Sequence, residues 1–123
     1  MGDTPAIRRG DVVLVSLPSV TDPARGKVRP AVVVQNDVGN RYGPNLIVAA
    51  VSSQLPTRAY PTNLVLRLGT PDAAGSGLDR DSVVQAEVIL TVPKSSVLRH
   101  LGSLVPATLQ AFDRCLKVSL GLT

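Results

Sequence analysis

The stretch Asp11-Val12-Val13-Leu14-Val15-Ser16-Leu17 decides the fold class of this chain. Branched side chains such as valine suit the half-buried surface of a pleated strand, so we expect a strand over Asp11–Leu17. The apolar run Val12–Val15 fills both faces of that strand. Both faces must therefore be covered, and a helix or a second subunit would serve as the second cover.

Four more apolar runs follow, and Gly, Pro, Asn or Asp residues bound each of them. Such residues favour turns, and the nineteen valines of the chain favour sheet over helix. The runs predict strands over Ala31–Gln35, Leu46–Ser52, Thr62–Leu68 and Val83–Val92. Five strands are enough to curl into a small β-barrel.

The pattern changes after Pro93. A short helix is expected over Ser95–Leu101, with Gly102 as its stop. A second helix is expected to begin at Pro106, to end at Gly121 and to cover the barrel. Its apolar residues recur at three- and four-residue spacing and form one stripe: Leu109, Phe112, Leu116 and Leu120.

The length of 123 residues predicts one domain over 1–123. A chain that is 44% hydrophobic and 18% charged is not a disordered one. Runs such as Leu46–Val51 are far shorter than the ~20 residues that span a bilayer, and Met1–Gly10 shows no secretory pattern. We therefore expect a cytoplasmic protein without a membrane segment. Thr70–Gly77 is expected to be a flexible loop.

The net charge of +4 is concentrated in one window of the sequence. Between residues 25 and 58, five basic residues face the single acid Asp37: Arg25, Lys27, Arg29, Arg41 and Arg58. A local basic surface is typical of proteins that bind phosphate or an acidic partner. The chain has only three aromatic residues, so a broad platform for stacking bases is not expected.

The usual catalytic residues are scarce. Asp79-Arg80-Asp81 is interpreted as a set of turn contacts rather than a metal site. The single histidine, His100, is interpreted as a surface or helix-end residue, and the single cysteine, Cys115, as a small core residue. Because hydrolase and phosphate-loop motifs are also missing, an enzyme built on this chain would work without His, Cys, a metal or another cofactor.

Two junctions remain as candidates. Pro30 biases Arg29 toward an extended conformation at the start of a strand, and Ser52-Ser53-Gln54 ends another strand with groups that can bind phosphate or a 2′-hydroxyl. The alternatives also stand: Arg29 as a surface charge, and the two serines as a strand-to-turn transition.

Four phrases, in this order and spacing, resemble the MazF/PemK family of toxin endoribonucleases between about Arg8 and Leu122. They are RGDVV (9–13), GKVRPAVVVQND (26–37), IVAAVSSQ (47–54) and DRDSV (79–83). The resemblance implies a mainly β fold with α: an SH3-like small barrel of the CcdB/PemK type with a short helix and a C-terminal helix. It also implies a homodimer that cleaves single-stranded RNA, usually mRNA, independently of metal and ribosome.

On this resemblance the catalytic residues are Arg29 and Ser52, with Ser53 as the fallback. The expected reaction is attack of a 2′-OH on the adjacent phosphate, which leaves a 2′,3′-cyclic phosphate and a 5′-OH end. The expected RNA-binding neighbours are Arg25, Gly26, Lys27, Gln54, Arg41 and Arg58. The family also implies a cognate antitoxin whose acidic, disordered segment competes for the basic groove.

Two departures from the family pattern bear on activity. Ala24 stands where relatives often have Glu, and Val88 and Leu90 stand where many have Gln and a basic residue. Two other functions therefore stay open. One is a non-catalytic toxin such as the related CcdB proteins, which bind gyrase, and the other is a degenerate homologue that binds RNA without cutting it.

Overall fold

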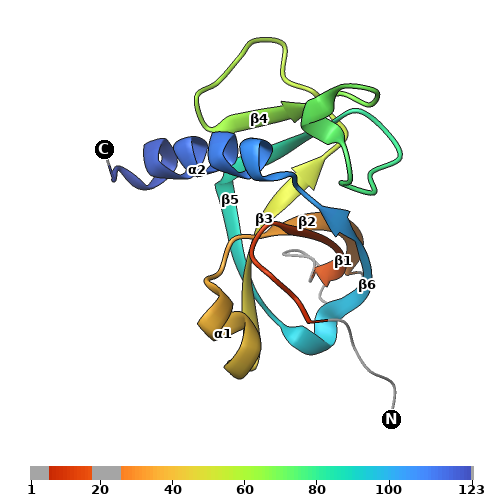
Figure 1. Cartoon of the computed structure of the whole chain (residues 1–123), viewed down its shortest axis with the longest axis vertical. Coiled ribbons are helices and arrows are strands. Elements are labelled where there is room, and N and C mark those ends of the chain that lie inside the picture. Colours follow the sequence, from red (N-terminus) through yellow and green to blue (C-terminus); the bar gives the residue numbers. More distant parts are fainter. Residues whose placement is uncertain (1–5, 18–25, 123) are drawn as a thin grey trace.

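Six strands form one antiparallel sheet in the order β4-β5-β3-β2-β1-β6 (Figure 1). The computed structural model describes residues 6–17 and 26–122. The strands are β1 (Asp11–Leu17), β2 (Lys27–Val33), β3 (Asn45–Ser52), β4 (Asn63–Leu66), β5 (Ser82–Pro93) and β6 (Val97–Ser103). The sheet curls strongly, but β4 and β6 form its two edges, so the predicted barrel is an open one. The mainly β class with added helices is confirmed.

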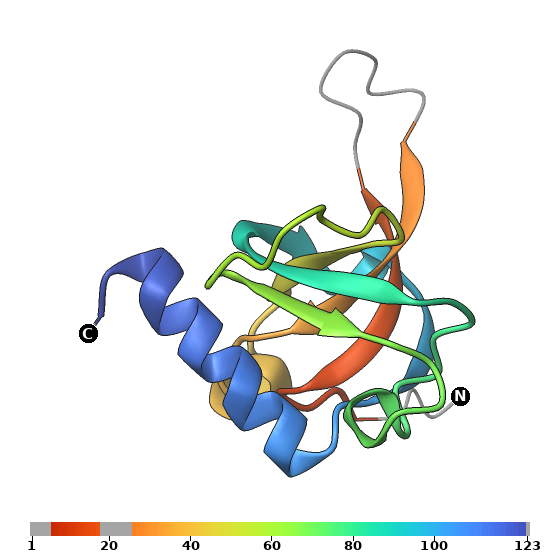
Figure 2. The same cartoon turned by 90° about the horizontal axis from the view of Figure 1, so that it is seen from above.

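Apolar residues are buried on both faces of the sheet, as the apolar run in β1 predicted. On one face the curled strands pack against one another through Val13, Val15, Ala31, Val33, Leu46, Val48 and Val92. On the other face, Val12 and Val32 pack with Phe112 and Leu116 of α2 (Pro106–Leu120). The helix is therefore the cover that the second face needed, and Figure 2 shows it lying across that face.

The C-terminal helix α2 begins and ends as predicted. Pro106 occupies its first turn, and Gly121 adopts the left-handed conformation (φ 68°) and donates its N–H to the carbonyls of Lys117 and Val118. Phe112 is fully buried, whereas Leu120 in the last turn is exposed. No helix among the described residues is long and apolar enough to cross a membrane.

The predicted helix over Ser95–Leu101 is wrong. A single 3₁₀ turn, η3 (Lys94–Ser96), leads directly into β6. That strand pairs with β1 along Asp11–Val15, so it satisfies the backbone groups of an edge that would otherwise be open. Tertiary pairing thus outweighs a weak local preference for helix. Gly102 lies within β6 and does not stop a helix. Glycine is needed there for another reason, because a Cβ would overlap the Gly75 carbonyl oxygen.

Two further segments differ from expectation. A helix that the sequence did not predict, α1 (Asp37–Tyr42), starts where the Asn36 side chain accepts a hydrogen bond from Gly39 N at 2.8 Å. The Thr70–Gly77 segment contains a 3₁₀ turn, η2 (Pro71–Ala73), and buries Ala73 and Ser76. It therefore packs as part of the fold and is not a free loop.

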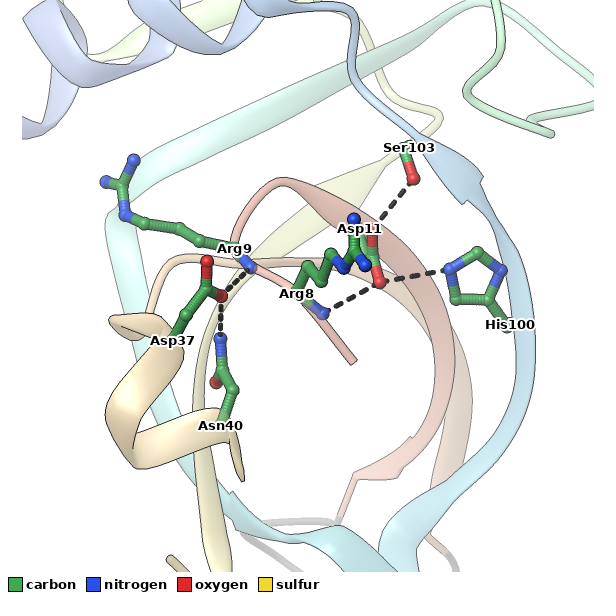
Figure 3. A network of polar contacts seen from close by, with 7 residues as sticks. All are labelled: Arg8, Arg9, Asp11, Asp37, Asn40, His100 and Ser103. Atoms are coloured by element: carbon green, nitrogen blue, oxygen red, sulfur yellow. Dashed lines mark hydrogen bonds and ion pairs between the residues drawn. The ribbon is translucent and has the colours of Figure 1, made fainter. Parts of the chain in front are cut away.

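A polar network ties the segment before β1 to α1 and β6 (Figure 3). The buried Asp11 carboxylate accepts hydrogen bonds from Arg8 N (2.9 Å) and Ser103 Oγ (2.7 Å), and His100 Nε2 lies 3.1 Å from it. On the other side, the Asp37 carboxylate accepts hydrogen bonds from Arg9 N at 2.7 Å and from Asn40. These bonds to Arg9 N and Asn40 hold the pKa of Asp37 below its ordinary value.

Candidate active site

Arg29 lies in β2 and Ser52 at the end of β3, and these two strands are antiparallel neighbours. Their register pairs Ala31 with Ala50. The pairing of the two strands ends there, and the same register two residues further along gives Arg29 and Ser52 matching positions on the sheet face that Ala31 and Ala50 share, because side chains repeat with a period of two. Two residues that lie 23 positions apart in the sequence are thus brought into one row across the sheet.

A surface hollow of about 540 Å³ surrounds this row, and we call it the Lys27 hollow. Its polar lining consists of Lys27, Arg29, Ser52, Ser53, Gln54 and Gln85. Its apolar lining includes Leu17, Val88 and Leu90. Five residues that the sequence singled out for catalysis or RNA contact therefore meet in one place.

The serines lie where the strand gives way to a turn. Ser52 Oγ accepts a hydrogen bond from Gln54 N at 3.1 Å, which fixes the start of the turn. A hydroxyl also carries a hydrogen, so Ser52 can still donate to an oxygen in the hollow. The strand-to-turn interpretation is thus correct, and it is compatible with a role in binding.

A second hollow, of about 360 Å³, adjoins the first, and we call it the Arg99 hollow. Its charged and hydroxyl lining consists of Arg29, Ser53, Asp79, Arg80, Ser82 and Arg99. Arg29, Val51 and Ser53 line both hollows and form the wall between them. Arg29 therefore stands at the centre of a continuous basic surface.

The other predicted RNA-binding residues are placed differently. Gly26 is exposed and directly precedes β2. A Cβ at this position would lie 2.8 Å from the Leu17 carbonyl oxygen, so the close approach of the end of β1 requires glycine here. Arg25 lies outside the described residues. Arg41 belongs to α1, with its guanidinium 5.2 Å from the Tyr42 ring centroid, and lines a separate hollow with Arg8 and Lys94. Arg58 is exposed between β3 and β4 and lines neither the Lys27 hollow nor the Arg99 hollow.

Sequence reasoning did not propose five polar residues that line the two hollows: Asp79, Arg80, Ser82, Gln85 and Arg99. Gln85 lies between the buried Val84 and Ala86, so the local alternation of apolar and polar residues over 84–87 was the signal that could have found it. Arg99 was hidden by its assignment to a helix, and Arg80 by its place in an acidic triplet.

Cys115, the two acids of the 79–81 triplet and His100, which the sequence analysis did not propose as catalytic, make structural contacts or lie at the surface. Cys115 belongs to α2 and is buried in the core, and burial raises the pKa of its thiol. Asp79 pairs with Arg80 at 3.1 Å, and Asp81 accepts a hydrogen bond from Leu68 N at 2.7 Å, so both acids make turn contacts. His100 is exposed on β6 and lines neither hollow.

Known proteins are similar to this chain in sequence and in fold. Endoribonuclease EndoA of Bacillus subtilis (strain 168) is 36% identical over 116 residues, which cover 94% of this chain and 96% of that protein. An endoribonuclease in complex with its cognate antitoxin from Mycobacterial species superposes with a TM-score of 0.75 at 24% identity, over 96% of this chain and 98% of its own. A MazE-MazF structure (Form-II) from Deinococcus radiodurans has the same TM-score at 19% identity and covers 98% of this chain and 100% of its own.

The family model described as PemK-like, MazF-like toxin of type II toxin-antitoxin system matches residues 8–120. That range includes every described strand and all the residues that line the Lys27 hollow and the Arg99 hollow. The chain therefore belongs to the PemK-like, MazF-like toxin family of type II toxin-antitoxin systems.

Proposed function

We propose that this chain is a sequence-specific endoribonuclease that cleaves single-stranded mRNA, without a metal ion or the ribosome, as the toxin of a type II toxin-antitoxin pair. The observation that carries the proposal is the placement of Arg29 and Ser52 in one row of the Lys27 hollow. Membership of the toxin family and 36% identity to a protein named endoribonuclease support it.

The proposed reaction begins when a ribose 2′-oxygen loses its proton and attacks the adjacent phosphorus. The bond from phosphorus to the 5′-oxygen then breaks, and that oxygen takes up a proton. The products are a 2′,3′-cyclic phosphate and a 5′-OH end, and DNA cannot react because it lacks the nucleophile.

Arg29 suits the stabilisation of the transition state. The pentavalent phosphorus carries extra negative charge, and a guanidinium stays protonated while it donates two parallel hydrogen bonds to phosphate oxygens. This fixed charge does at the phosphate what a metal ion does in other nucleases. Ser52 donates a further hydrogen bond from its hydroxyl to a non-bridging oxygen or to the 2′-OH.

The remaining parts of the proposal concern partners and location. A cognate antitoxin with an acidic, disordered segment would bind the basic surface around Arg29, and charge complementarity supports that. A homodimer is supported by exposed apolar side chains on β3 and at the C-terminal end of α2, namely Ile47, Leu120 and Leu122, which line a hollow of about 480 Å³. A cytoplasmic location follows from an mRNA substrate.

The test is incubation of the purified chain with several long single-stranded RNAs in EDTA, with matched single-stranded DNAs as controls. The expected result is discrete RNA cuts, mapped by primer extension, with uncut DNA. The new 5′ ends should accept label from polynucleotide kinase without phosphatase treatment. Binding without any cut would instead favour the degenerate homologue, and neither binding nor cuts would favour a toxin that acts on a protein.

A further inference from the structure

The Arg99 hollow carries a net positive charge. The reaction proposed at Arg29 assigns no role to the other two arginines that line this hollow, Arg80 and Arg99. Arg80 and Arg99 line it together with Arg29, against the single acid Asp79. That acid is already paired with Arg80 Nε at 3.1 Å. The hydroxyl groups of Ser53 and Ser82 add polar lining. Such a set of donors suits an oxyanion, because arginine donates several hydrogen bonds in a fixed fork.

The wall of this hollow is fixed by close backbone packing. Gly77 lines the hollow with φ at 73°, and a Cβ there would overlap the Leu101 carbonyl oxygen. Ser103 N donates a hydrogen bond to Gly75 O at 2.8 Å. These contacts hold the 70–77 segment against β6, the strand that bears Arg99. The cationic side chains therefore stand on a rigid support, which favours a built site over a mobile surface.

The Arg99 hollow adjoins the proposed reaction centre. The wall between the two hollows is formed by Arg29, Val51 and Ser53. In the sheet, Leu14 of β1 pairs with Pro30 on one side and with Arg99 on the other. An RNA strand whose scissile phosphate lies at Arg29 thus has a second cationic hollow directly beside it.

We propose that the Arg99 hollow is a second RNA subsite, which binds a backbone phosphate next to the scissile one through Arg99 and Arg80. This inference rests on the proposed ribonuclease function. Among residues 6–17 and 26–122, no aromatic side chain lines the hollow, so these residues offer no surface for stacking a base there. Phosphate contacts position a strand without reading its sequence, and the subsite therefore sets affinity and register rather than base preference.

The experiment measures binding of an RNA oligonucleotide that spans a mapped cleavage motif and carries a 2′-O-methyl group at the scissile nucleotide. Affinity is measured over a range of salt concentrations for wild type, Arg99→Gln, Arg99→Lys and the control Arg114→Gln. Arg114 is exposed on α2 and lines neither hollow. Thermal unfolding of each variant checks that it is folded.

Loss of one phosphate contact should lower the slope of log K against log[salt] by about 0.7. We expect this loss in Arg99→Gln, with affinity reduced about tenfold at low salt. Arg99→Lys should keep most of the slope because it keeps the charge, and Arg114→Gln should match wild type. The base motif mapped with Arg99→Gln should be unchanged.

An unchanged slope in Arg99→Gln, while wild type binds RNA, overturns the subsite and leaves the proposed function intact. The subsite is equally overturned if Arg99→Gln loses affinity for an oligoglutamate peptide but not for RNA, because the hollow then serves an acidic protein segment. Wild type that binds none of the RNAs overturns the proposed function itself, and the subsite with it.

Discussion

Replacement of Ser52 by alanine tests the proposed site at its hydroxyl. Removal of one preorganised donor to a developing oxyanion costs about 10² to 10³ in kcat, or roughly 3 to 4 kcal/mol. The same change removes the 3.1 Å hydrogen bond from Gln54 N, which is exposed. A bond of that kind contributes only about 0.5 to 1.5 kcal/mol to stability. Activity should therefore fall far more than stability does.

The assay is single-turnover cleavage of an RNA that carries the mapped motif, with urea unfolding measured on the same samples. Ser52→Thr should retain most activity because it keeps the hydroxyl. The comparison variant is Ser53→Ala: Ser53 follows the last residue of β3 and lies outside the row that the β2–β3 register builds, so its loss should cost less than about tenfold although it lines both hollows. A Ser52→Ala variant within a few-fold of wild type, or a larger loss in Ser53→Ala, would refute the register argument.

Three other predictions follow from single side chains. Gln85→Leu should change the cleavage motif while cutting persists, because it removes an amide that can read a base in the Lys27 hollow; end mapping on a random RNA pool checks this, and an unchanged motif contradicts it. Asp37 has a lowered pKa in the folded chain, so its ionised carboxylate stabilises the fold at neutral pH and that contribution disappears as the pH falls through the lowered value. Urea midpoints of Asp37→Asn should thus lie below wild type at pH 7 and converge with it in strong acid. The buried Cys115 thiol should react with iodoacetamide at least about tenfold more slowly in the folded chain than in urea, and equal rates would contradict its burial.

The sequence predicted the parts of the fold that local chemistry determines. The apolar run in β1 predicted the strand bounds and the burial of both faces, and Pro106 and Gly121 bounded α2 correctly. The prediction of secondary structure failed where pairing with a strand far away in the sequence determines the local structure. Residues 97–103 form a strand because β1 offers an unpaired edge, and no local pattern in Ser95–Leu101 carries that information.

The residues of the candidate site also fall into two groups, those that the sequence predicted and those that only strand pairing reveals. Arg29 and Ser52 were found through resemblance and strand-end chemistry, and the β2–β3 register gives the physical reason why they meet. Gln85 and Arg99 were missed, because each joins a hollow only through the pairing of its strand with another one. Arg41 was chosen for its charge alone, and it lines a different hollow.

The measurement that tests the central claim most directly compares wild type, Arg29→Ala and Arg29→Lys, each verified as folded, on one long single-stranded RNA in EDTA. Wild type should give discrete cuts with 5′-OH ends. Arg29→Ala should give none, and Arg29→Lys should lose most activity, because lysine keeps the charge but not the fork that grips two phosphate oxygens. Near-normal cleavage by Arg29→Lys would contradict the proposal that Arg29 grips two phosphate oxygens. Cleavage by Arg29→Ala would show that Arg29 is not a catalytic residue.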